Sequence, residues 1–584
     1  MIRTYGWVQN PSDFSKLKLV VQIFDATSSH YINLKNNLVP NYIFFDDLRA
    51  NLLAKLNANK VVFSYSELVG SSKDKNGNSP RSRKDAVADG LIQVTVLPQS
   101  AATKGKMWTD NWTSDGFLRW ALTLNFVEHD RETDLCKITQ SGIEFSRSDN
   151  SSLDEKECLR KAILSYPPAT RVLEILKNNS ESVNKFHIGS QLGFVGEKGF
   201  TSYSDAVMTK WLISSSNDEQ KKIRSDIEGT SDKYARMIAT WLEKLDLVEK
   251  KSSTIDTKYG TATDFIKFSI TGRGIHALNQ INGSSKNTKI TKYLTWEFLA
   301  TDGSNKNYLR TRRAHILKSL QQTPSLSSLM SKLKQLGFNE SLAVIKNDIQ
   351  GLINFGIRIE LTDSKAILKD LICDFSIPET DLTLEIQDQR IAAKKAQFLE
   401  NTNINPKYLE LLDIAYNGSR NRDFEILTAD LFNNVFGVDT ILLGGGRKPD
   451  AIINDNNFGV IIDTKAYESG YSKNITEEDK MVRYIEDNQY RDTERNSTAW
   501  WGDFKDTIPT TEFYFMWVSS KFIGEFHTQL EATNKRTQTN GCSINVEQLL
   551  IGADLVLKNQ LHTKNFPEYM QNKEINWRDL GLIH

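Results

Sequence analysis

Apolar positions along the chain repeat one order of elements in three segments. They begin at residue 115 ("DGFLRWALTLNFVEHDRETDLCKITQSGIEF"), at residue 232 ("DKYARMIATWLEKLDLVEKKSSTIDTKYGTATDFIKFSITGRGIHAL") and at residue 343 ("AVIKNDIQGLINFGIRIELTDSKAILKD"). In each, apolar residues at helical spacing end in a cluster, and a strand, a polar turn and a returning strand follow. This is the order of a winged helix, and its repetition predicts three related modules. Such arrays usually bind DNA; the alternative is that they only mediate protein contacts.

The helix expected from residue 231 can be analysed residue by residue. Ser231 is the expected N-cap, because its hydroxyl can accept a hydrogen bond from a first-turn N–H group. The positions expected to face the core are Ala235, Ile238, Trp241, Leu242 and Leu245. Lys233 and Arg236 then lie on the outer face, where a recognition helix presents donors to guanine O6 and N7. The alternative is a helix that two cations merely make soluble.

The pattern changes beyond Pro378, where a polar helical stretch runs to Pro406 and predicts a linker. Helices are then expected at 407–416, 421–436, 476–490, 523–534 and 545–556, and strands near 440–443, 449–453, 458–464 and 512–519. Strands that alternate with helices around a mixed sheet indicate an α/β domain. We therefore expect a multidomain chain of α+β and α/β class, with winged-helix-like subdomains at 1–150, 151–285 and 286–377, a linker at 378–406 and an α/β domain at 407–584.

Length and composition agree with several folded domains. At roughly 100–200 residues per domain, 584 residues predict about three to five. Hydrophobic residues at 39% and charged residues at 25% exclude the composition of a disordered chain. The first residues lack the apolar region of a signal peptide and no run of about 18 apolar residues occurs, so we expect a cytoplasmic protein without membrane contact. The four cysteines lack C-x-x-C spacing and predict reduced thiols.

The net charge is zero, but the charge is unevenly distributed. Between 270 and 320 two acids, Glu297 and Asp302, stand against nine cations: Arg273, Lys286, Lys289, Lys292, Lys306, Arg310, Arg312, Arg313 and Lys318. Such a segment suits contact with a polyanion. A solvated basic face is the alternative.

The stretch 444–470, "GGGRKPDAIINDNNFGVIIDTKAYESG", carries charges that an apolar strand does not need. Asp463 and Lys465 are two apart on one expected strand and so share a face, while Asp450 lies on the strand before it. Two carboxylates are a typical protein contribution to a Mg²⁺ (magnesium) site, and a lysine beside them can stabilise charge on a phosphate. The same triplet spacing at 154–156, 256–258 and 503–505 lacks a second acid-bearing strand. A surface strand with ordinary charges is the alternative.

The order Pro449-Asp450, then Asp463-Thr464-Lys465, resembles the PD-(D/E)XK nuclease motif. The flanking text "GGGRKPD", "GVIIDTKAY", "RYIEDNQYR" and "VEQLLIGA" is similar to the cleavage domain of the FokI-like type IIS restriction endonucleases. The similarity extends over most of the chain, through "GWVQNP", "DNWTSDGFLRWAL", "SYPPATRVL", "EGTSDKYARMI", "YLRTRRAHIL" and "GLINFGI". The chain departs from that family mainly in loops, including a Lys/Asn-rich loop at 71–89 and a shorter gap between the two aspartates.

The resemblance implies three recognition subdomains that bind the asymmetric duplex site 5′-GGATG-3′, as in an isoschizomer-like relative, and a tethered nuclease that cuts both strands downstream. It implies Asp450, Asp463 and Lys465 as catalytic residues and Asp450, Asp463 and Thr464 as ligands of Mg²⁺. The implied DNA-binding residues are Gln9, Asn10, Arg81, Gln99, Trp112, Glu228, Lys233 and Arg236. Arg81 and Gln99 fall in the altered loop region.

One active site per chain must act on a duplex whose strands have opposite polarity, so two nuclease domains must meet. On the helix expected from Thr476, Asp479 and Arg483 are spaced i,i+4. One interpretation is an intrahelical ion pair worth about 0.2–0.5 kcal/mol. The resemblance implies instead a two-fold interface of a transient homodimer, in which each Asp479 meets the partner's Arg483.

Two other functions remain open at this point. A repair or recombination nuclease that recognises DNA structure would use the same catalytic motif. A sequence-specific DNA-binding regulator with a decayed nuclease fold would keep the winged helices, but the intact Asp450, Asp463 and Lys465 count against it.

Overall fold

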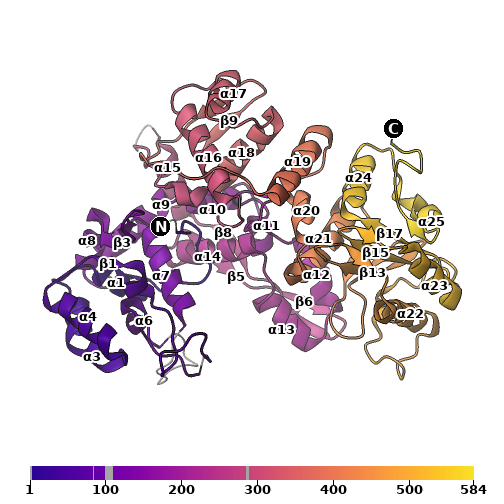
Figure 1. Ribbon diagram of the computed structural model, residues 1–584, viewed down its shortest axis with the longest axis horizontal. Coiled ribbons are helices and arrows are strands. Elements are labelled where there is room, and N and C mark those ends of the chain that lie inside the picture. Colours follow the sequence, from indigo (N-terminus) through magenta and orange to yellow (C-terminus); the bar gives the residue numbers. More distant parts are fainter. Residues whose placement is uncertain (1–2, 83, 99–109, 285–287, 584) are drawn as a thin grey trace.

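A computed structural model of the chain describes residues 3–82, 84–98, 110–284 and 288–583. Figure 1 shows the first subdomain at one end, the second in the middle with the third above it, and the C-terminal domain at the other end. Three subdomains of helices and short antiparallel sheets precede a domain built on a larger sheet. This order confirms the predicted fold class.

The first subdomain contains the predicted winged helix. Its α7 (Asn111–Thr123) leads into antiparallel β2 (Val127–His129) and β3 (Leu135–Ile138), and α8 (Gln140–Arg147) follows. A short β1 (Phe63–Ser64) completes the sheet in the order β1-β3-β2. The other helices are α1 (Phe14–Gln22), α2 (Ser29–Asn33), α3 (Val39–Tyr42), α4 (Asp46–Asn57), α5 (Tyr65–Val69) and α6 (Leu91–Thr95).

The second subdomain repeats this plan with an insertion. After α14 (Thr230–Lys244), β5 (Val248–Lys251) pairs with β8 (Lys267–Ile270), and α15 (Gly272–Asn282) follows. A hairpin of β6 (Thr254–Thr257) and β7 (Gly260–Thr263) is inserted between β5 and β8. The elements before α14 are α9 (Leu153–Ser165), α10 (Pro167–Lys177), β4 (Val183–Asn184), α11 (Lys185–Gly189), α12 (Asp205–Ser214) and α13 (Asn217–Ser225).

The start of α14 differs from the prediction. The helix begins at Thr230 after the N-cap Gly229, and Ser231 is buried inside the first turn. The capping group is the carboxylate of Asp232, which accepts from the N–H of Gly229 at 2.9 Å and from that of Tyr203 at 3.1 Å. Ser231 as N-cap is therefore wrong, because the helix begins one residue before it and its hydroxyl donates to the main-chain oxygen of Leu192 at 3.2 Å. The predicted core face is confirmed at Ala235, Ile238, Trp241 and Leu242.

The third subdomain carries the third predicted helix and hairpin, in α18 (Leu342–Phe355), β9 (Ile359–Leu361) and β10 (Ala366–Leu368). Two further helices, α16 (Lys306–Leu320) and α17 (Leu326–Gln335), precede them. The expectation that the basic segment at 270–320 suits contact with a polyanion, and its alternative of a solvated basic face, both fail for several of its cations, which are buried as partners of internal carboxylates. The Nε atoms of Arg312 and Arg313 donate to the two oxygens of Asp348 at 2.6 and 2.9 Å, and Lys292 pairs with Asp370 at 2.8 Å.

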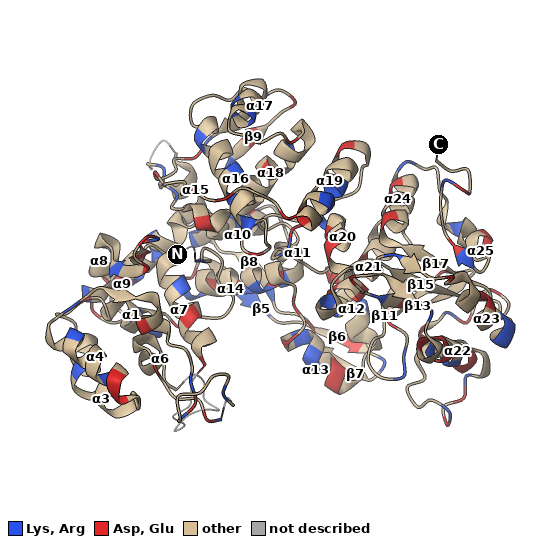
Figure 2. Ribbon diagram, in the orientation of Figure 1, with Lys and Arg blue, Asp and Glu red and all other residues tan. Residues whose placement is uncertain are grey.

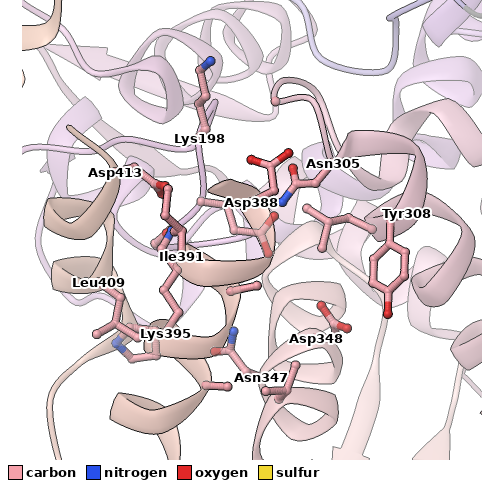
Figure 3. Close-up of a pocket in the computed structure, with 18 of the residues that line it drawn as sticks. Lys198, Asn305, Tyr308, Asn347, Asp348, Asp388, Ile391, Lys395, Leu409 and Asp413 are labelled. Atoms are coloured by element: carbon pink, nitrogen blue, oxygen red, sulfur yellow. The ribbon is translucent and has the colours of Figure 1, made fainter. Parts of the chain in front are cut away.

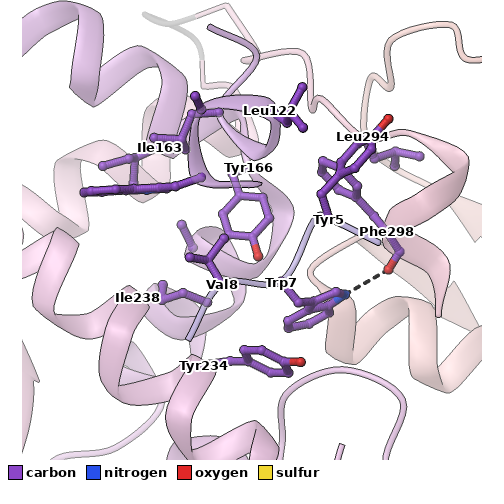
Figure 4. Packing of buried hydrophobic residues seen from close by; sticks show 14 of the residues in the cluster. Tyr5, Trp7, Val8, Leu122, Ile163, Tyr166, Tyr234, Ile238, Leu294 and Phe298 are labelled. Atoms are coloured by element: carbon purple, nitrogen blue, oxygen red, sulfur yellow. Dashed lines mark hydrogen bonds between the residues drawn. The ribbon is translucent and has the colours of Figure 1, made fainter. Parts of the chain in front are cut away.

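The segment at the N-terminus packs between the three subdomains (Figure 4). Trp7 is buried, and its Nε1 donates to the main-chain oxygen of Phe298 at 2.8 Å. Its ring also lies against Tyr234 of α14, with 5.0 Å between the ring centroids. Because Gln9 and Asn10 follow directly, this burial fixes their position relative to α14.

A helix, α19 (Ile386–Asn401), occupies most of the predicted linker. The structure describes all of α19, and Phe398 is its one buried side chain. A cavity of about 400 Å³ lies between α19, the second and third subdomains and the start of the C-terminal domain (Figure 3). Among the residues that line it are Lys198, Asn305, Tyr308, Asp388, Lys395 and Asp413. The C-terminal domain is thus attached through a helix that buries little of its own surface.

The C-terminal domain is built on a mixed sheet of six described strands in the order β11-β12-β13-β15-β17-β18. These strands are β11 (Thr440–Leu442), β12 (Ala451–Asn454), β13 (Gly459–Lys465), β15 (Phe513–Ser519), β17 (Gly541–Asn545) and β18 (Lys573–Glu574). The first three are antiparallel, and the strands from β13 onward are parallel. The predicted helix at 407–416 is a 3-10 turn (Pro406–Glu410) followed by the short α20 (Leu411–Ile414).

Helices cover both faces of this sheet. Val460 and Ile462 share a core with α21 (Asn421–Asn434) and α24 (Val546–Leu557). The neighbouring Ile461 shares a separate core with α22 (Ile475–Tyr490) and α23 (His527–Thr537). Because side chains alternate along a strand, this division decides which helix each polar residue of β13 faces.

Two negative expectations can be compared with the described residues. No helix among them is long and apolar enough to cross a bilayer. All four cysteines are free, with Cys136 and Cys542 buried and Cys158 and Cys373 half-buried. Their side chains therefore form no disulfide in the described part of the chain.

Candidate active site and nucleic-acid interface

Two carboxylates meet where β12 and β13 lie side by side. Asp450 directly precedes β12, and Asp463 lies near the end of β13. The antiparallel register, with Ala451 opposite Ile462, brings Asp450 beside Thr464. Thr464 donates to Asp450 Oδ2 twice, from its N–H at 2.7 Å and from its hydroxyl at 2.9 Å. The pairing of the two strands therefore fixes Asp450 close to the end of β13.

Lys465 lies on the same face of β13 as Asp463, as the spacing predicts. Its Nζ is 2.8 Å from Asp463 Oδ1 and 2.9 Å from Glu477 Oε2, in the first turn of α22. The ammonium group also lies 5.4 Å from the centre of the Trp517 ring. The lysine is thus held between one carboxylate from the sheet and one from a helix, and the second was not predicted.

The electrostatics of the pair are unusual. Burial, followed by the charge of Asp450, raises the pKa of Asp463 well above its ordinary value, although Lys465 opposes this. Burial alone would lower the pKa of Lys465, but the charges of Asp463 and Asp450 raise it. Two carboxyl groups that are forced together in a poorly solvated site disfavour the charged form. The charge of Lys465 thus does not fully offset the repulsion between the two carboxylates, which a further cation beside them would relieve.

A third acid, Glu425 on α21, lies within electrostatic reach. Burial, followed by the charge of Asp450, raises the pKa of Glu425 to about 7, although its ion pair with Arg422 opposes this. Glu425 was not among the residues predicted from the sequence. A signal existed, because Glu425 precedes the buried Thr428, Ala429 and Phe432 by three, four and seven residues and so lies on an apolar helix face.

The donor set suits a hard divalent cation. Asp450 and Asp463 offer carboxylate oxygens, which are the ligands that Mg²⁺ prefers, and their mutual repulsion is what a cation relieves. Within the described ranges, no group of three or more His, Cys, Asp or Glu side chains is placed so that it could hold a metal ion.

The predicted DNA-binding residues of the first subdomain lie together. Gln9, Asn10 and Trp112 line one pocket, together with the cations Arg119 and Lys306. Trp112, in the first turn of α7, has 57% of its surface exposed, which is unusual for tryptophan in a folded protein. With its amide turned, the Asn10 oxygen accepts from Trp112 Nε1 at 3.1 Å.

The predicted DNA-binding residues of the second subdomain lie around the N-terminus of α14. They differ in whether their side chains are free to contact DNA. Glu228 is buried between two cations, 2.6 Å from Arg236 and 2.9 Å from Lys185. Burial would raise the pKa of Glu228, but these two partners lower it. Lys233, by contrast, makes no hydrogen bond or ion pair from its side chain with any described residue and is half-buried at the surface. A DNA contact by Glu228 would require its ion pairs to open.

Two further predicted contacts lie in the altered loop region. Arg81 is half-buried in the loop at 71–89. Gln99 lies outside the described residues.

Asp479 and Arg483 are both exposed on α22 but do not pair with each other. Asp479 Oδ1 lies 2.8 Å from Arg536 on α23, which also contacts Glu478 at 2.9 Å. Arg483 forms no ion pair with any residue that the structure describes. The interpretation as an intrahelical ion pair is therefore wrong, because the neighbouring helix supplies a closer cation.

The C-terminal domain also lies against the second subdomain, near the two carboxylates. Trp211 of α12 donates from Nε1 to the main-chain oxygen of Leu443 at 3.2 Å. Lys448 lies 3.2 Å from Glu219 on α13, a helix that carries both acids and bases (Figure 2). Leu443 and Lys448 flank the glycine-rich loop that leads to Asp450. The second subdomain thus contacts the rim of the site.

Comparison with known proteins gives one consistent result along the chain. Four family models match the chain. The two models for the FokI recognition domain, subdomains 1 and 2, match residues 3–148 and 155–283. The model for the FokI D3 domain matches residues 299–364, and that for the FokI cleavage domain matches residues 386–576. The type II restriction enzyme FokI of Planomicrobium okeanokoites is 40% identical, over 99% of each chain. The type II restriction enzyme StsI of Streptococcus sanguinis is 27% identical, over 99% of this chain and 97% of that one.

Solved structures give the same result in three dimensions. The structure of restriction endonuclease FokI superposes with a TM-score of 0.88 at 38% identity and covers 98% of this chain and 100% of its own. The structure of FokI bound to DNA also gives a TM-score of 0.88 at 38% identity and covers 99% and 100%.

The raised pKa of Glu425 predicts a pH-dependent stability. At pH 4 the carboxyl carries its proton in the folded and unfolded states alike, so Glu425→Gln should leave the thermal midpoint nearly unchanged. The unfolded group ionises near 4.5 and the folded one near 7. The folded state therefore loses stability between these values, by about 3 kcal/mol when complete. At pH 8, in chelator, Glu425→Gln should raise the midpoint by several degrees.

Thermal unfolding at the two pH values measures this effect. Glu494→Gln, at an exposed glutamate, is the control and should change neither midpoint. A lower midpoint for Glu425→Gln at pH 8 would mean that the ion pair with Arg422 outweighs the cost of burial.

Proposed function

Because the chain belongs to the FokI family of type II restriction enzymes and is therefore a site-specific deoxyribonuclease, we propose that it binds 5′-GGATG-3′ and cuts both strands downstream with Mg²⁺. The observation that carries this proposal is the meeting of Asp450, Asp463 and Lys465, in the region that the FokI cleavage-domain model matches. The solved structure of FokI bound to DNA supports duplex DNA as the partner.

The proposal assigns the chemistry to the end of β13. Asp450 and Asp463, with the main-chain carbonyl oxygen of Thr464, would hold the Mg²⁺ ion. When bound, that ion neutralises charge on the scissile phosphate and makes a bound water more acidic. Thr464 fixes Asp450 through two hydrogen bonds, so this carboxylate needs little reorganisation. The ammonium group of Lys465 stands beside Asp463, where it can donate to an oxygen of the phosphate.

The proposal assigns sequence reading to two groups of residues. Trp112 offers an exposed aromatic face beside Gln9 and Asn10, and Lys233 is available at the N-terminus of α14. Arg236 lies one turn further along and is engaged with Glu228. The same proposal divides the chain into recognition subdomains at 1–150, 151–285 and 286–377, a linker at 378–406 and a nuclease domain at 407–584.

Cleavage of both strands requires a second copy, since the chain carries one such site. We propose a transient homodimer through α22, in which Asp479 meets the partner's Arg483. The exposure of both side chains supports this, as does the absence of a described ion-pair partner for Arg483. Arg536 competes with the partner's Arg483 for Asp479, which favours a weak and transient interface.

The first prediction of this proposed function separates catalysis from binding. Asp450→Ala or Asp463→Ala should abolish cleavage of a duplex that carries 5′-GGATG-3′, while site binding stays nearly intact, because the carboxylates and the base-reading residues lie in different domains. Gel analysis of cleavage with saturating magnesium and a binding titration measure the two effects. Asp256→Ala removes the aspartate of an identical Asp-Thr-Lys triplet on the β6–β7 hairpin and should cut normally.

The cleavage pattern of the unmodified chain tests the function itself. Cuts at one fixed offset from the site support the proposal, whereas cuts only at ends or junctions would identify a structure-specific nuclease. Cutting by Asp450→Ala or Asp463→Ala within tenfold of the unmodified chain would contradict the assignment of the catalytic residues.

The second prediction concerns base reading. Lys233→Ala should weaken binding to the cognate duplex by about 1–3 kcal/mol and relax discrimination at one base pair, because a good base contact is lost. Competition binding with single-base variants of the site measures both effects. An equal loss for cognate and scrambled duplexes would show that Lys233 contacts the DNA backbone instead.

The third prediction concerns the homodimer. Cleavage of dilute, single-site DNA should rise more steeply than linearly with protein concentration. Asp479→Arg should suppress cutting because it places like charges across the two-fold axis, and mixing it with Arg483→Asp should restore cutting. Binding should not change in either variant.

Arg536→Ala is the matched control, because it removes the partner of Asp479 within the chain and keeps the Asp479 charge. It should cut at least as well as the unmodified chain. The interface lies elsewhere if Asp479→Arg cuts normally at low concentration, or if the mixture gives no rescue.

A further inference from the structure

The contact between Glu477 and Lys465 joins the catalytic strand to a helix that the sequence motif does not include. Glu477 Oε2 lies 2.9 Å from Lys465 Nζ, and its other oxygen lies 2.5 Å from Lys480 Nζ. The side chain of Glu477 is 15% exposed, as is that of Lys465. This is therefore a largely buried ion pair between two elements and not a surface pair along one helix.

The position of Glu477 is fixed by the way α22 packs. Asn474 caps the helix and accepts from the N–H of Glu477 at 3.3 Å. Further along the helix, Met481 and Ile485 are buried in the core that α22 forms with the sheet. The first turn of α22 is consequently held against the end of β13, and its glutamate reaches the lysine without depending on a loop.

We propose that Glu477 is a positioning residue, which holds the ammonium group of Lys465 beside the scissile phosphate when Asp463 binds the divalent cation. This inference rests on the proposed function.

The charges around Lys465 leave Glu477 to hold the ammonium group once a cation binds. In the structure two carboxylates hold the ammonium group, and one of them, Asp463, is a proposed metal ligand. A cation at Asp463 repels the ammonium group and competes for the same oxygens. Lysine has a flexible four-carbon stem and does not stay in one place by itself. Among the described residues, Glu477 on α22 is then the remaining carboxylate within ion-pair distance of the lysine.

The adjacent glutamate provides a matched control. Glu478 lies in the same turn, its side chain is 14% exposed, and it forms an ion pair at 2.9 Å with Arg536. It thus matches Glu477 in residue type and burial, but its partner is an arginine on α23 and not a lysine on β13. A general effect on α22 should appear in both variants, whereas an effect on Lys465 should appear only at Glu477.

The experiment compares Glu477→Gln, Glu477→Asp and Glu478→Gln in the full chain. Single-turnover cleavage is measured with magnesium, at protein concentrations where the rate no longer rises. We expect Glu477→Gln to lower the rate constant by about tenfold or more, the scale of a misplaced catalytic group, with unchanged DNA affinity and thermal midpoint. Glu477→Asp, which keeps the charge, should recover part of the rate. Glu478→Gln should stay within about twofold, because Lys465 keeps both carboxylates.

A second readout does not depend on cleavage. Lysine amines are acylated in the metal-free protein and the products are measured by mass spectrometry. Lys465 should be labelled faster in Glu477→Gln than in the unmodified chain. In Glu478→Gln its labelling rate should equal that of the unmodified chain. Lys558, which pairs with Asp554 at 2.6 Å on α24, is the internal reference.

The outcomes are distinct. Unchanged cleavage by Glu477→Gln, or an equal loss in both variants, overturns the inference, as does unchanged labelling of Lys465. If the unmodified chain cuts no DNA, the proposed function fails, while the labelling still decides whether Glu477 holds Lys465.

Discussion

Repulsion between two carboxyl groups in a poorly solvated site is the constraint on which the C-terminal domain depends. Asp450 and Asp463 are kept together by the antiparallel register of β12 and β13 and by the hydrogen bonds from Thr464. Lys465 supplies the one ammonium group within ion-pair distance of Asp463 among the described residues, and Glu477 holds it from the other side. The sheet and α22 therefore stabilise an arrangement that is unfavourable in itself, as is common where a site is built to receive a cation.

The recognition half depends on buried contacts, both aromatic and ionic. Trp7 joins α14 to the third subdomain through its contacts with Tyr234 and Phe298, and so fixes the adjacent Gln9 and Asn10. The buried carboxylate of Asp348 holds two arginines of α16 in the same half. These contacts place the exposed Trp112 and the half-buried Lys233 on one assembly of subdomains, although the two side chains come from different winged helices.

The sequence predicted those features whose causes are local. Asp463 and Lys465 were found because a spacing of two on an apolar strand decides which face they share. Glu425 and Glu477 were missed because they reach the site only after α21 and α22 pack on opposite faces of the sheet. Local charge counting also failed for Arg313, whose partner Asp348 lies 35 residues away. The N-cap at Ser231 was wrong for a similar reason, since the adjacent Asp232 also binds Tyr203 from a distant loop.

The contact between α12 and the C-terminal domain has a consequence for the synthesis of the chain. Lys210 of α12 pairs with Asp439, which follows it by 229 residues, and the apolar Met208 and Leu212 belong to the same core as the nuclease sheet. A ribosome adds about 5–20 residues per second, so this apolar face waits roughly 10–45 s for its partner. During that interval the nascent chain exposes a surface that the finished protein buries. The second subdomain is therefore more prone to aggregate during translation than after the chain is complete.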